Sequence, residues 1–140
     1  MISVQAALDA LFALTQKPDV EWVNLTKASG RVLARPMKAL RDQPPFDASA
    51  MDGYAIAQPA AKRGDSYRVI GEAAAGRRFK GDLTPGTAVR IFTGAPVPAG
   101  TSAIIIQENA TRTADRIELT EDPNAQSYIR PAGNDFKAGS

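Results

Sequence analysis

A fold of the α+β class, mainly β with a few helices, is predicted for this 140-residue chain. One amphipathic helical pattern occurs near the N-terminus. After residue 60, short runs of β-branched and apolar residues alternate with turns that contain Gly or Pro. Because such turns recur about every 8–15 residues, antiparallel hairpins are favoured over βαβ units.

The first expected element is a helix over residues 3–16, SVQAALDALFALTQ. Ser3 can cap its N-terminus, and Pro18 lies just beyond its end, where a helix does not continue. Its apolar stripe consists of Val4, Ala7, Leu8, Leu11 and Leu14. A short helical turn is expected next, with Thr26 as its N-cap and Gly30 near its end.

Five strands are expected after residues 36–59, a stretch that Pro, Asp and Gly interrupt repeatedly. The turns GDLTPG, GAPVPAG and TEDPN separate most of these strands from one another. The expected strand ranges are 66–75, 88–94, 102–109, 115–121 and 126–130. Together they predict a mostly antiparallel β lobe that follows a helical N-terminal piece.

The chain contains no cysteine and no histidine. Disulfides, zinc sites of the Cys or His type, and Ser–His–Asp or Cys–His nucleophiles are therefore excluded within this chain. Acid–base or metal chemistry has to use Asp, Glu, Lys, Tyr or backbone oxygen. Such oxygen ligands suit Mg²⁺ better than softer metals.

The charge and hydropathy patterns bear on partners and compartment. The 17 basic and 15 acidic residues leave a net charge of only +2 and are scattered, so no nucleic-acid partner is expected. No apolar run approaches the ~20 residues of a membrane-spanning helix, so no membrane association is expected. The first residues lack a signal-peptide pattern, which makes the cytoplasm the expected compartment.

The stretch PPFDASAMDGYA, residues 44–55, is too broken for a helix and too polar for a buried strand. One interpretation is a tight structural turn, in which Asp47 and Ser49 close side-chain turns and Gly53 takes a positive φ. The other interpretation is that Asp52 faces a cleft and acts as a metal ligand or an electrostatic group. The residue types alone leave both interpretations open.

A second notable loop is IFTGAPVPAG, residues 91–100. Thr93 and Gly94 can offer a hydroxyl and close-approaching backbone N–H groups to an oxyanion. The loop lacks the Gly-Lys-Ser/Thr ending of a Walker A motif, so a nucleotide P-loop is not indicated. A plain hairpin connection kept open by prolines is the alternative.

Four motifs, in this order, resemble the N-terminal half of the MoeA family, the molybdopterin molybdenumtransferases to which the C-terminal region of gephyrin is related. The motifs are PPFDASAMDGYA, GEAAAGRRF, RIFTGAPVPAGTSAIIIQE and IRPAGNDFKAG. The resemblance extends over nearly the whole chain. It implies a small β lobe, residues 42–128, inserted in a discontinuous base lobe formed by residues 1–41 and 129–140.

The resemblance also implies a function. Family enzymes insert molybdenum from molybdate into adenylylated molybdopterin and release AMP, with Mg²⁺ assisting, in a cleft between the two protomers of a homodimer. Asp52 matches the family's functional acid and is the candidate catalytic residue and a possible metal ligand. Thr93, Ser49 and Gly94 are the candidate substrate-binding residues, and Asp47 and Ser49 are expected to brace the loop.

Two departures from the family pattern affect this expectation. Ala48 stands where the family usually has Asn, which removes an amide from the loop. Family members are also much longer than this chain. We therefore expect an N-terminal fragment that does not catalyse by itself. The alternative is a non-catalytic module for dimerisation or protein binding, of the gephyrin type.

Overall fold

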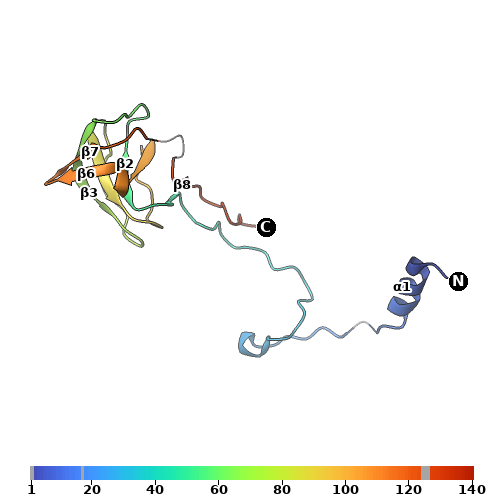
Figure 1. Ribbon diagram of the computed structural model, residues 1–140. Coiled ribbons are helices and arrows are strands. Elements are labelled where there is room, and N and C mark those ends of the chain that lie inside the picture. Colours follow the sequence, from blue (N-terminus) through green and yellow to red (C-terminus); the bar gives the residue numbers. More distant parts are fainter. Residues whose placement is uncertain (1, 17, 124–126) are drawn as a thin grey trace. The chain divides into compact units, whose positions relative to one another are not determined.

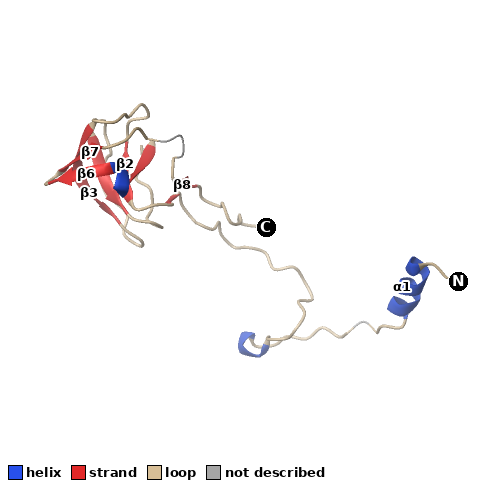
Figure 2. Ribbon diagram, in the orientation of Figure 1, coloured by secondary structure: helices blue, strands red, loops and turns tan. Residues whose placement is uncertain are grey.

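The computed structural model describes residues 2–16, 18–123 and 127–140. The chain divides into two compact units, Met1–Met37 and Lys38–Ser140. Helix α1 belongs to the first unit and the strands belong to the second (Figures 1 and 2). The predicted class, mainly β with few helices, is confirmed. The division into a lobe of residues 42–128 and a base lobe of residues 1–41 and 129–140 stays a prediction.

The first unit contains α1 (Val4–Ala13) and a short 3-10 helix, η1 (Leu25–Lys27). As predicted, the Ser3 side chain caps α1 by accepting a hydrogen bond from the Ala6 N–H, at 3.1 Å. The predicted cap at Thr26 is wrong. The side chain of Asn24 accepts from the Thr26 N–H at 3.0 Å, and the helical turn therefore begins earlier than expected.

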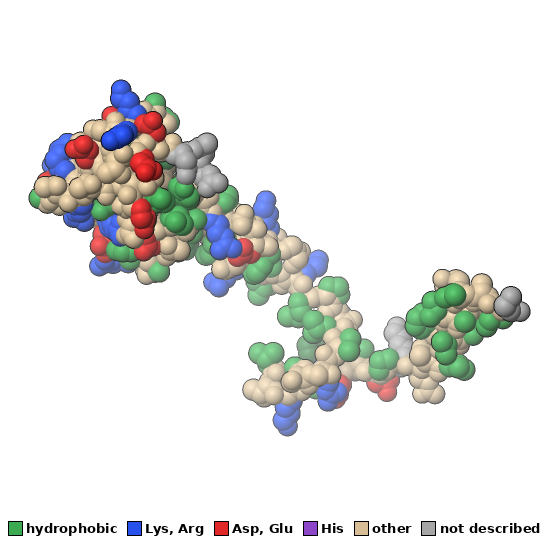
Figure 3. All heavy atoms as spheres, in the orientation of Figure 1, with side chains coloured by type: hydrophobic (Ala, Val, Ile, Leu, Met, Phe, Trp, Pro, Cys, Tyr) green, Lys and Arg blue, Asp and Glu red, His purple; other side chains and the backbone are tan. Residues whose placement is uncertain are grey.

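The described residues of the first unit do not bury the apolar stripe of α1. No residue of α1 is buried, and hydrophobic side chains are visible on its surface in Figure 3. With 10 residues, α1 has about half the length that a membrane-spanning helix needs, and no other helix in the described ranges qualifies as a span.

The second unit is built on a six-stranded sheet with the strand order β5-β2-β4-β3-β7-β6. A separate two-stranded pair joins β1 (Ala48–Ser49) to β8 (Ile129–Arg130). The strands of the sheet are β2 (Gly53–Ile56), β3 (Ser66–Ala73), β4 (Thr87–Ile91), β5 (Ala103–Ile106), β6 (Ala110–Thr113) and β7 (Arg116–Leu119).

Strands β3, β4 and β7 correspond to three of the predicted strands. The predicted strand 102–109 is shorter than expected, because the 3-10 helix η2 (Gln107–Asn109) ends β5 and separates it from β6. In the predicted strand 126–130, residue 126 lies outside the described residues, and β8 occupies the end of the range. The sheet is mostly antiparallel as predicted, with β3 and β4 as a parallel pair.

Strand β2 was not predicted, although it is an interior strand of the sheet. It pairs antiparallel with β4 on one edge and with β5 on the other. All four of its residues are buried. Tyr54 and Ile56 belong to one hydrophobic cluster and Ala55 to a second one, because successive side chains of a strand point to opposite faces.

The chain segment before the sheet pairs with the last residues. The Ala39 N–H donates to the Ser140 carbonyl at 2.9 Å, and the Gln43 N–H donates to the Phe136 carbonyl at 2.9 Å. The β1–β8 pair continues this contact towards the sheet. These bonds hold the approach to the 44–55 loop against the 129–140 segment.

Gly53, the first residue of β2, has a different role from the one expected. Its φ is not positive, so the turn conformation proposed for it is wrong. Instead, a Cβ atom at this position would lie 1.9 Å from the backbone oxygen of Ile105. Gly53 is therefore required by the close approach of β5 to β2.

We predict that Gly53→Ala destabilises the second unit by about 3 kcal/mol or more, at the upper end of the range for overpacking. The clashing atom belongs to the backbone, so a side-chain rotation cannot relieve the contact. Urea unfolding measures this change. The control is Gly64→Ala, where φ is +86° but nothing lies within 4 Å, so that only backbone strain of about 1–2 kcal/mol is expected. An equal loss in the two variants would contradict the prediction.

Candidate functional site

Three strand ends meet at one end of the six-stranded sheet. Gly53 of β2 pairs with Ile91 at the end of β4 and with Ile106 at the end of β5. The residues next to these positions therefore converge, although they lie far apart in the sequence. We call Asp52, Arg90, Thr93 and Gln107 the strand-end site.

Asp52 and Thr93 are in direct contact within this site. One carboxylate oxygen of Asp52, Oδ1, accepts hydrogen bonds from both the backbone N–H and the hydroxyl of Thr93, each at 2.7 Å. The Asp52 carbonyl accepts from the Gln107 N–H at 3.0 Å. Among the described residues, none donates to the other carboxylate oxygen, Oδ2. One oxygen is thus fixed by the fold, and the other is available to a ligand.

The surroundings of Asp52 favour its charged form. The backbone N–H of Thr93, and then its hydroxyl, hold the pKa of Asp52 below its usual value of 3.8. Slight desolvation acts in the opposite direction, and the positive charge of Arg90 lowers the pKa further. Asp52 is therefore a carboxylate at neutral pH.

The turn that carries Thr93 is held by the backbone of Ser49. The Ala95 N–H donates to the Phe92 carbonyl at 2.9 Å, and Gly94 has a φ of 79°, as glycine does in a type II turn. The Gly94 N–H donates to the Ser49 carbonyl at 2.8 Å, and the Ser49 N–H donates to the Ala95 carbonyl at 3.0 Å. In the described structure, the N–H groups of Thr93, Gly94 and Ala95 are all bonded to protein acceptors.

Ser49 and Asp47 brace the loop, as expected, but with different partners. The buried Ser49 hydroxyl donates to the Met51 carbonyl at 2.6 Å, which closes a local turn. Asp47 accepts a hydrogen bond from the Ala132 N–H at 2.8 Å, across 85 residues of sequence. Asp47 therefore ties the loop to the 129–140 segment rather than closing a turn of its own.

Arg90 and Gln107 complete the strand-end site and were not singled out from the sequence. The Arg90 guanidinium lies over the rings of both Tyr54 and Phe92, 5.0 Å and 4.8 Å from their centroids. It donates to the Gly53 carbonyl at 3.3 Å and to Gln107 Oε1 at 2.7 Å. In the sequence, Arg90 is a charged residue between the apolar residues Val89 and Ile91. A solvent-facing residue of a half-buried strand would give the same pattern.

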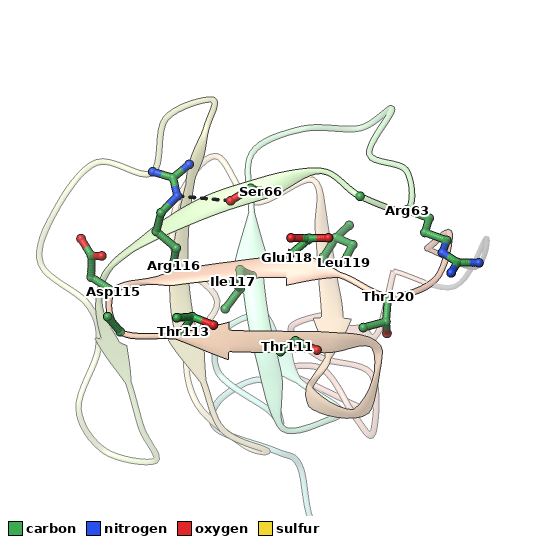
Figure 4. Close-up of a pocket in the computed structure, with 12 residues that line it drawn as sticks. Arg63, Ser66, Thr111, Thr113, Asp115, Arg116, Ile117, Glu118, Leu119 and Thr120 are labelled. Carbon is green, nitrogen blue, oxygen red and sulfur yellow. Dashed lines mark hydrogen bonds between the residues drawn. The ribbon is translucent and has the colours of Figure 1, made fainter.

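Two surface depressions in the described part of the second unit do not coincide with the strand-end site. Figure 4 shows the larger, about 660 Å³, over β6 and β7, where the Arg116 Nε–H donates to Ser66 Oγ at 3.2 Å. Its charged residues are of both signs, Arg63 and Arg116 against Asp115 and Glu118. None of the predicted site residues lines it. We therefore place the candidate site by its polar contacts and not by the volume of a depression.

The described residues contain no cluster of three or more His, Cys, Asp or Glu side chains that could hold a metal ion. Asp52 is the one predicted ligand, and its Oδ2 can supply a single oxygen. The described part of this chain does not by itself provide a complete set of metal ligands. The predictions that Asp52 is catalytic and that Thr93, Ser49 and Gly94 bind substrate remain predictions.

Comparison with known proteins gives a consistent result. Residues 2–140 match the family model for the MoeA N-terminal region, domains I and II. A molybdopterin molybdenumtransferase of Nostoc is 35% identical over 100% of this chain and 34% of its own length. One from Haemophilus influenzae is 37% identical over 96% of this chain and 34% of its own length.

Solved structures give the same picture. A crystal structure of a molybdopterin biosynthesis MoeA protein from Pyrococcus horikoshii matches with a TM-score of 0.74 and 29% identity, over 99% of this chain and 37% of that one. A second structure from that organism matches with a TM-score of 0.77 and 37% identity, over 87% of this chain and 34% of that one. This chain therefore spans about a third of the length of the relatives that it matches.

We predict that the Asp52 carboxyl titrates below pH 3.8, as followed by NMR of its side-chain carbon. A lowered folded-state pKa stabilises the fold above pH 3.8, and this contribution is lost as the pH falls through the folded value. Asp52→Asn should therefore reduce the acid sensitivity of stability. Thr93→Val removes the hydroxyl but keeps the N–H, so the Asp52 pKa should rise only part of the way to 3.8. A midpoint at or above 3.8 in the unaltered chain would contradict the assignment.

Proposed function

The chain belongs to the MoeA family, as its N-terminal region, and we propose that it forms part of a molybdenum cofactor biosynthesis enzyme. The proposed reaction is that of a molybdopterin molybdenumtransferase, in which molybdenum from molybdate enters adenylylated molybdopterin and AMP is released. The observation that carries the proposal is the Asp52–Thr93 contact, because it presents an ionised carboxylate at the end of a rigid sheet. Residues on strand ends are positioned more accurately than residues on free loops.

Asp52 acts in this proposal as a negatively charged group and not as a proton donor. Its pKa is lowered, so it carries no proton at neutral pH and is also a weak base. No described residue donates to its Oδ2, which can therefore accept a hydrogen bond or ligate a cation. Electrostatic binding or metal ligation therefore fits Asp52 better than general acid catalysis does.

We propose that Thr93 orients Asp52, because both of its hydrogen-bond donors are directed to Oδ1. The hydroxyl oxygen of Thr93 still has lone pairs with which it can accept from substrate. Ser49 is only 2% exposed, and the Gly94 N–H is bonded to it. Their contribution to substrate binding would then be indirect, through the turn that carries Thr93.

Mg²⁺ fits this site only as an ion shared with other groups. Asp52 would supply one carboxylate oxygen, and Mg²⁺ commonly takes one or two carboxylates together with substrate phosphates and water. When bound, the ion would neutralise negative charge on phosphate or molybdate oxygens. Adenylylated molybdopterin and molybdate are the proposed substrates. Neither nucleic acid nor a membrane is a proposed partner, and the cytoplasm is the proposed compartment.

The activity is proposed for a protein of the relatives' length and not for these 140 residues alone. Two thirds of the relatives' length has no counterpart in this chain. Substrate orientation can account for ~7–11 kcal/mol of a reaction barrier, and one carboxylate cannot supply it. We therefore expect this chain by itself to be inactive.

The alternative function, a non-catalytic dimerisation or protein-binding module, is supported by a separate observation. Large apolar side chains before residue 40 are highly exposed, among them Trp22 at 98% and Val32 at 95%. Where such side chains form a contiguous patch, they indicate a surface that another protein covers. A homodimer contact through this segment is compatible with both functions. Only molybdenum insertion distinguishes them.

We predict that Asp52→Asn, in a full-length protein that contains this region, lowers molybdenum cofactor synthesis by about 10²-fold or more, the size of effect seen when a charge-stabilising group is removed. The measurement is cofactor formation from adenylylated molybdopterin and molybdate with purified protein. Asp115→Asn is the matched control, because this aspartate lies in the turn between β6 and β7, away from the strand-end site. Activity in Asp52→Asn equal to that of the control would contradict the proposed role of Asp52.

A further inference from the structure

We propose that Arg90 is the positioning residue of the strand-end site, where its guanidinium holds the ends of β2, β4 and β5 in the register that brings Asp52 to Thr93. The geometric part of this proposal stands by itself. Its consequence for catalysis rests on the proposed function. Arg90 lies next to the last residue of β4, and its hydrogen bonds reach Gly53 of β2 and Gln107, the residue that follows β5.

The first set of contacts is with aromatic rings. The guanidinium lies 5.0 Å from the centroid of Tyr54, in β2, and 4.8 Å from that of Phe92, which follows β4. A planar cation that contacts two rings is restricted in position and orientation. Phe92 immediately precedes Thr93, so this contact also limits the movement of the turn that carries Thr93.

The second set of contacts is with Gly53 and Gln107, both of which adjoin the backbone of Asp52. Arg90 donates to the carbonyl of Gly53, the residue that follows Asp52. It also donates to the side chain of Gln107, whose own backbone N–H donates to the Asp52 carbonyl. Arg90 therefore acts on the position of Asp52 through Gly53 and Gln107, and it makes no hydrogen bond to the Asp52 carboxylate.

Arg90 differs from the arginines of this chain that form ion pairs. In the described residues, Arg31, Arg77 and Arg130 pair with carboxylates of exposed side chains, and Arg90 appears in no such pair. Its directional partners are a carbonyl and an amide oxygen. Its charge also lies close enough to Asp52 to favour the ionised carboxylate.

Only an arginine can make all of these contacts together. Lysine keeps the charge but lacks the planar fork that donates in two directions and packs flat against rings. Methionine keeps part of the packing but loses the charge and both hydrogen bonds. Arg90→Lys and Arg90→Met therefore separate charge from positioning.

The first experiment measures amide hydrogen exchange by NMR in this chain. In Arg90→Met and in Arg90→Lys, the amides of Thr93 and Gln107 should exchange about 10-fold faster or more, while amides in the middle of β3 and β4 change little. Arg112→Met is the matched control, because Arg112 donates to a backbone carbonyl, that of Ala114, at 3.0 Å. If Thr93 and Gln107 keep their protection in both Arg90 variants, the proposal is overturned.

The second experiment measures kcat and KM for the same variants in a full-length protein, well below the melting temperature. Both Arg90 variants should lose about 10–100-fold in kcat with little change in KM, since misplaced catalytic groups affect the chemical step. A residue that only stabilised the fold would lower the melting temperature and leave kcat per folded molecule unchanged. Full kcat in Arg90→Lys would mean that charge alone matters, and would overturn the positioning role.

The test also holds if one variant does not fold or if the full-length protein is inactive. If Arg90→Met does not fold, Arg90→Lys and Gln107→Leu carry the test. Gln107→Leu removes the acceptor of one Arg90 hydrogen bond and also an exposed hydrogen bond to Glu108, but leaves the Arg90 side chain in place. Gln107→Leu should also speed the hydrogen exchange of the Thr93 amide. If the unaltered full-length protein forms no cofactor, the proposed function fails, while the exchange measurement still decides the positioning role of Arg90.

Discussion

The close approach of β5 to the first residue of β2 is the constraint on which the rest of the site depends. Because Gly53 has only a hydrogen atom as its side chain, β5 can pair with β2 beginning at Gly53, the first residue of β2. Strand β4 pairs with the other edge of β2 at the same residue. The end of β4 and the end of β5 then lie beside Asp52. A side chain at residue 53 would push β5 away and separate Gln107 from the Asp52 backbone.

The two carboxylates of the 44–55 loop have different surroundings, which supports different roles. Asp47 accepts from Ala132 and so joins chain segments that lie 85 residues apart in the sequence. Asp52 is held through one oxygen by Thr93 and presents the other. It is therefore a structural residue as well as a candidate functional one, and removing it should disturb the Thr93 turn as well as the chemistry.

Local patterns predicted part of this structure, and pairing between distant segments accounts for the rest. The 3.6-residue spacing located α1, and short runs of β-branched and apolar residues between turns located β3, β4 and β7. Strand β2 was missed because GYAI is short, buried on both faces and lies next to a loop rich in Pro and Asp. Asp52 and Thr93 could each be singled out from the sequence. Their contact could not be predicted from local patterns, because the two residues lie 41 positions apart. Arg90 could not be found, since its role depends on the register of three strands.

The central claim is that Asp52 and Thr93 act as one unit, and a double-mutant cycle on activity in a full-length protein tests it most directly. Asp52→Asn, Thr93→Val and the double variant are compared by kcat/KM, with Thr93→Ser as the control that keeps the hydroxyl. If Thr93 acts by orienting Asp52, the double variant loses no more activity than Asp52→Asn alone, and Thr93→Ser stays near the unaltered protein. Losses that multiply in the double variant would contradict the claim, because Thr93 would then act independently of Asp52.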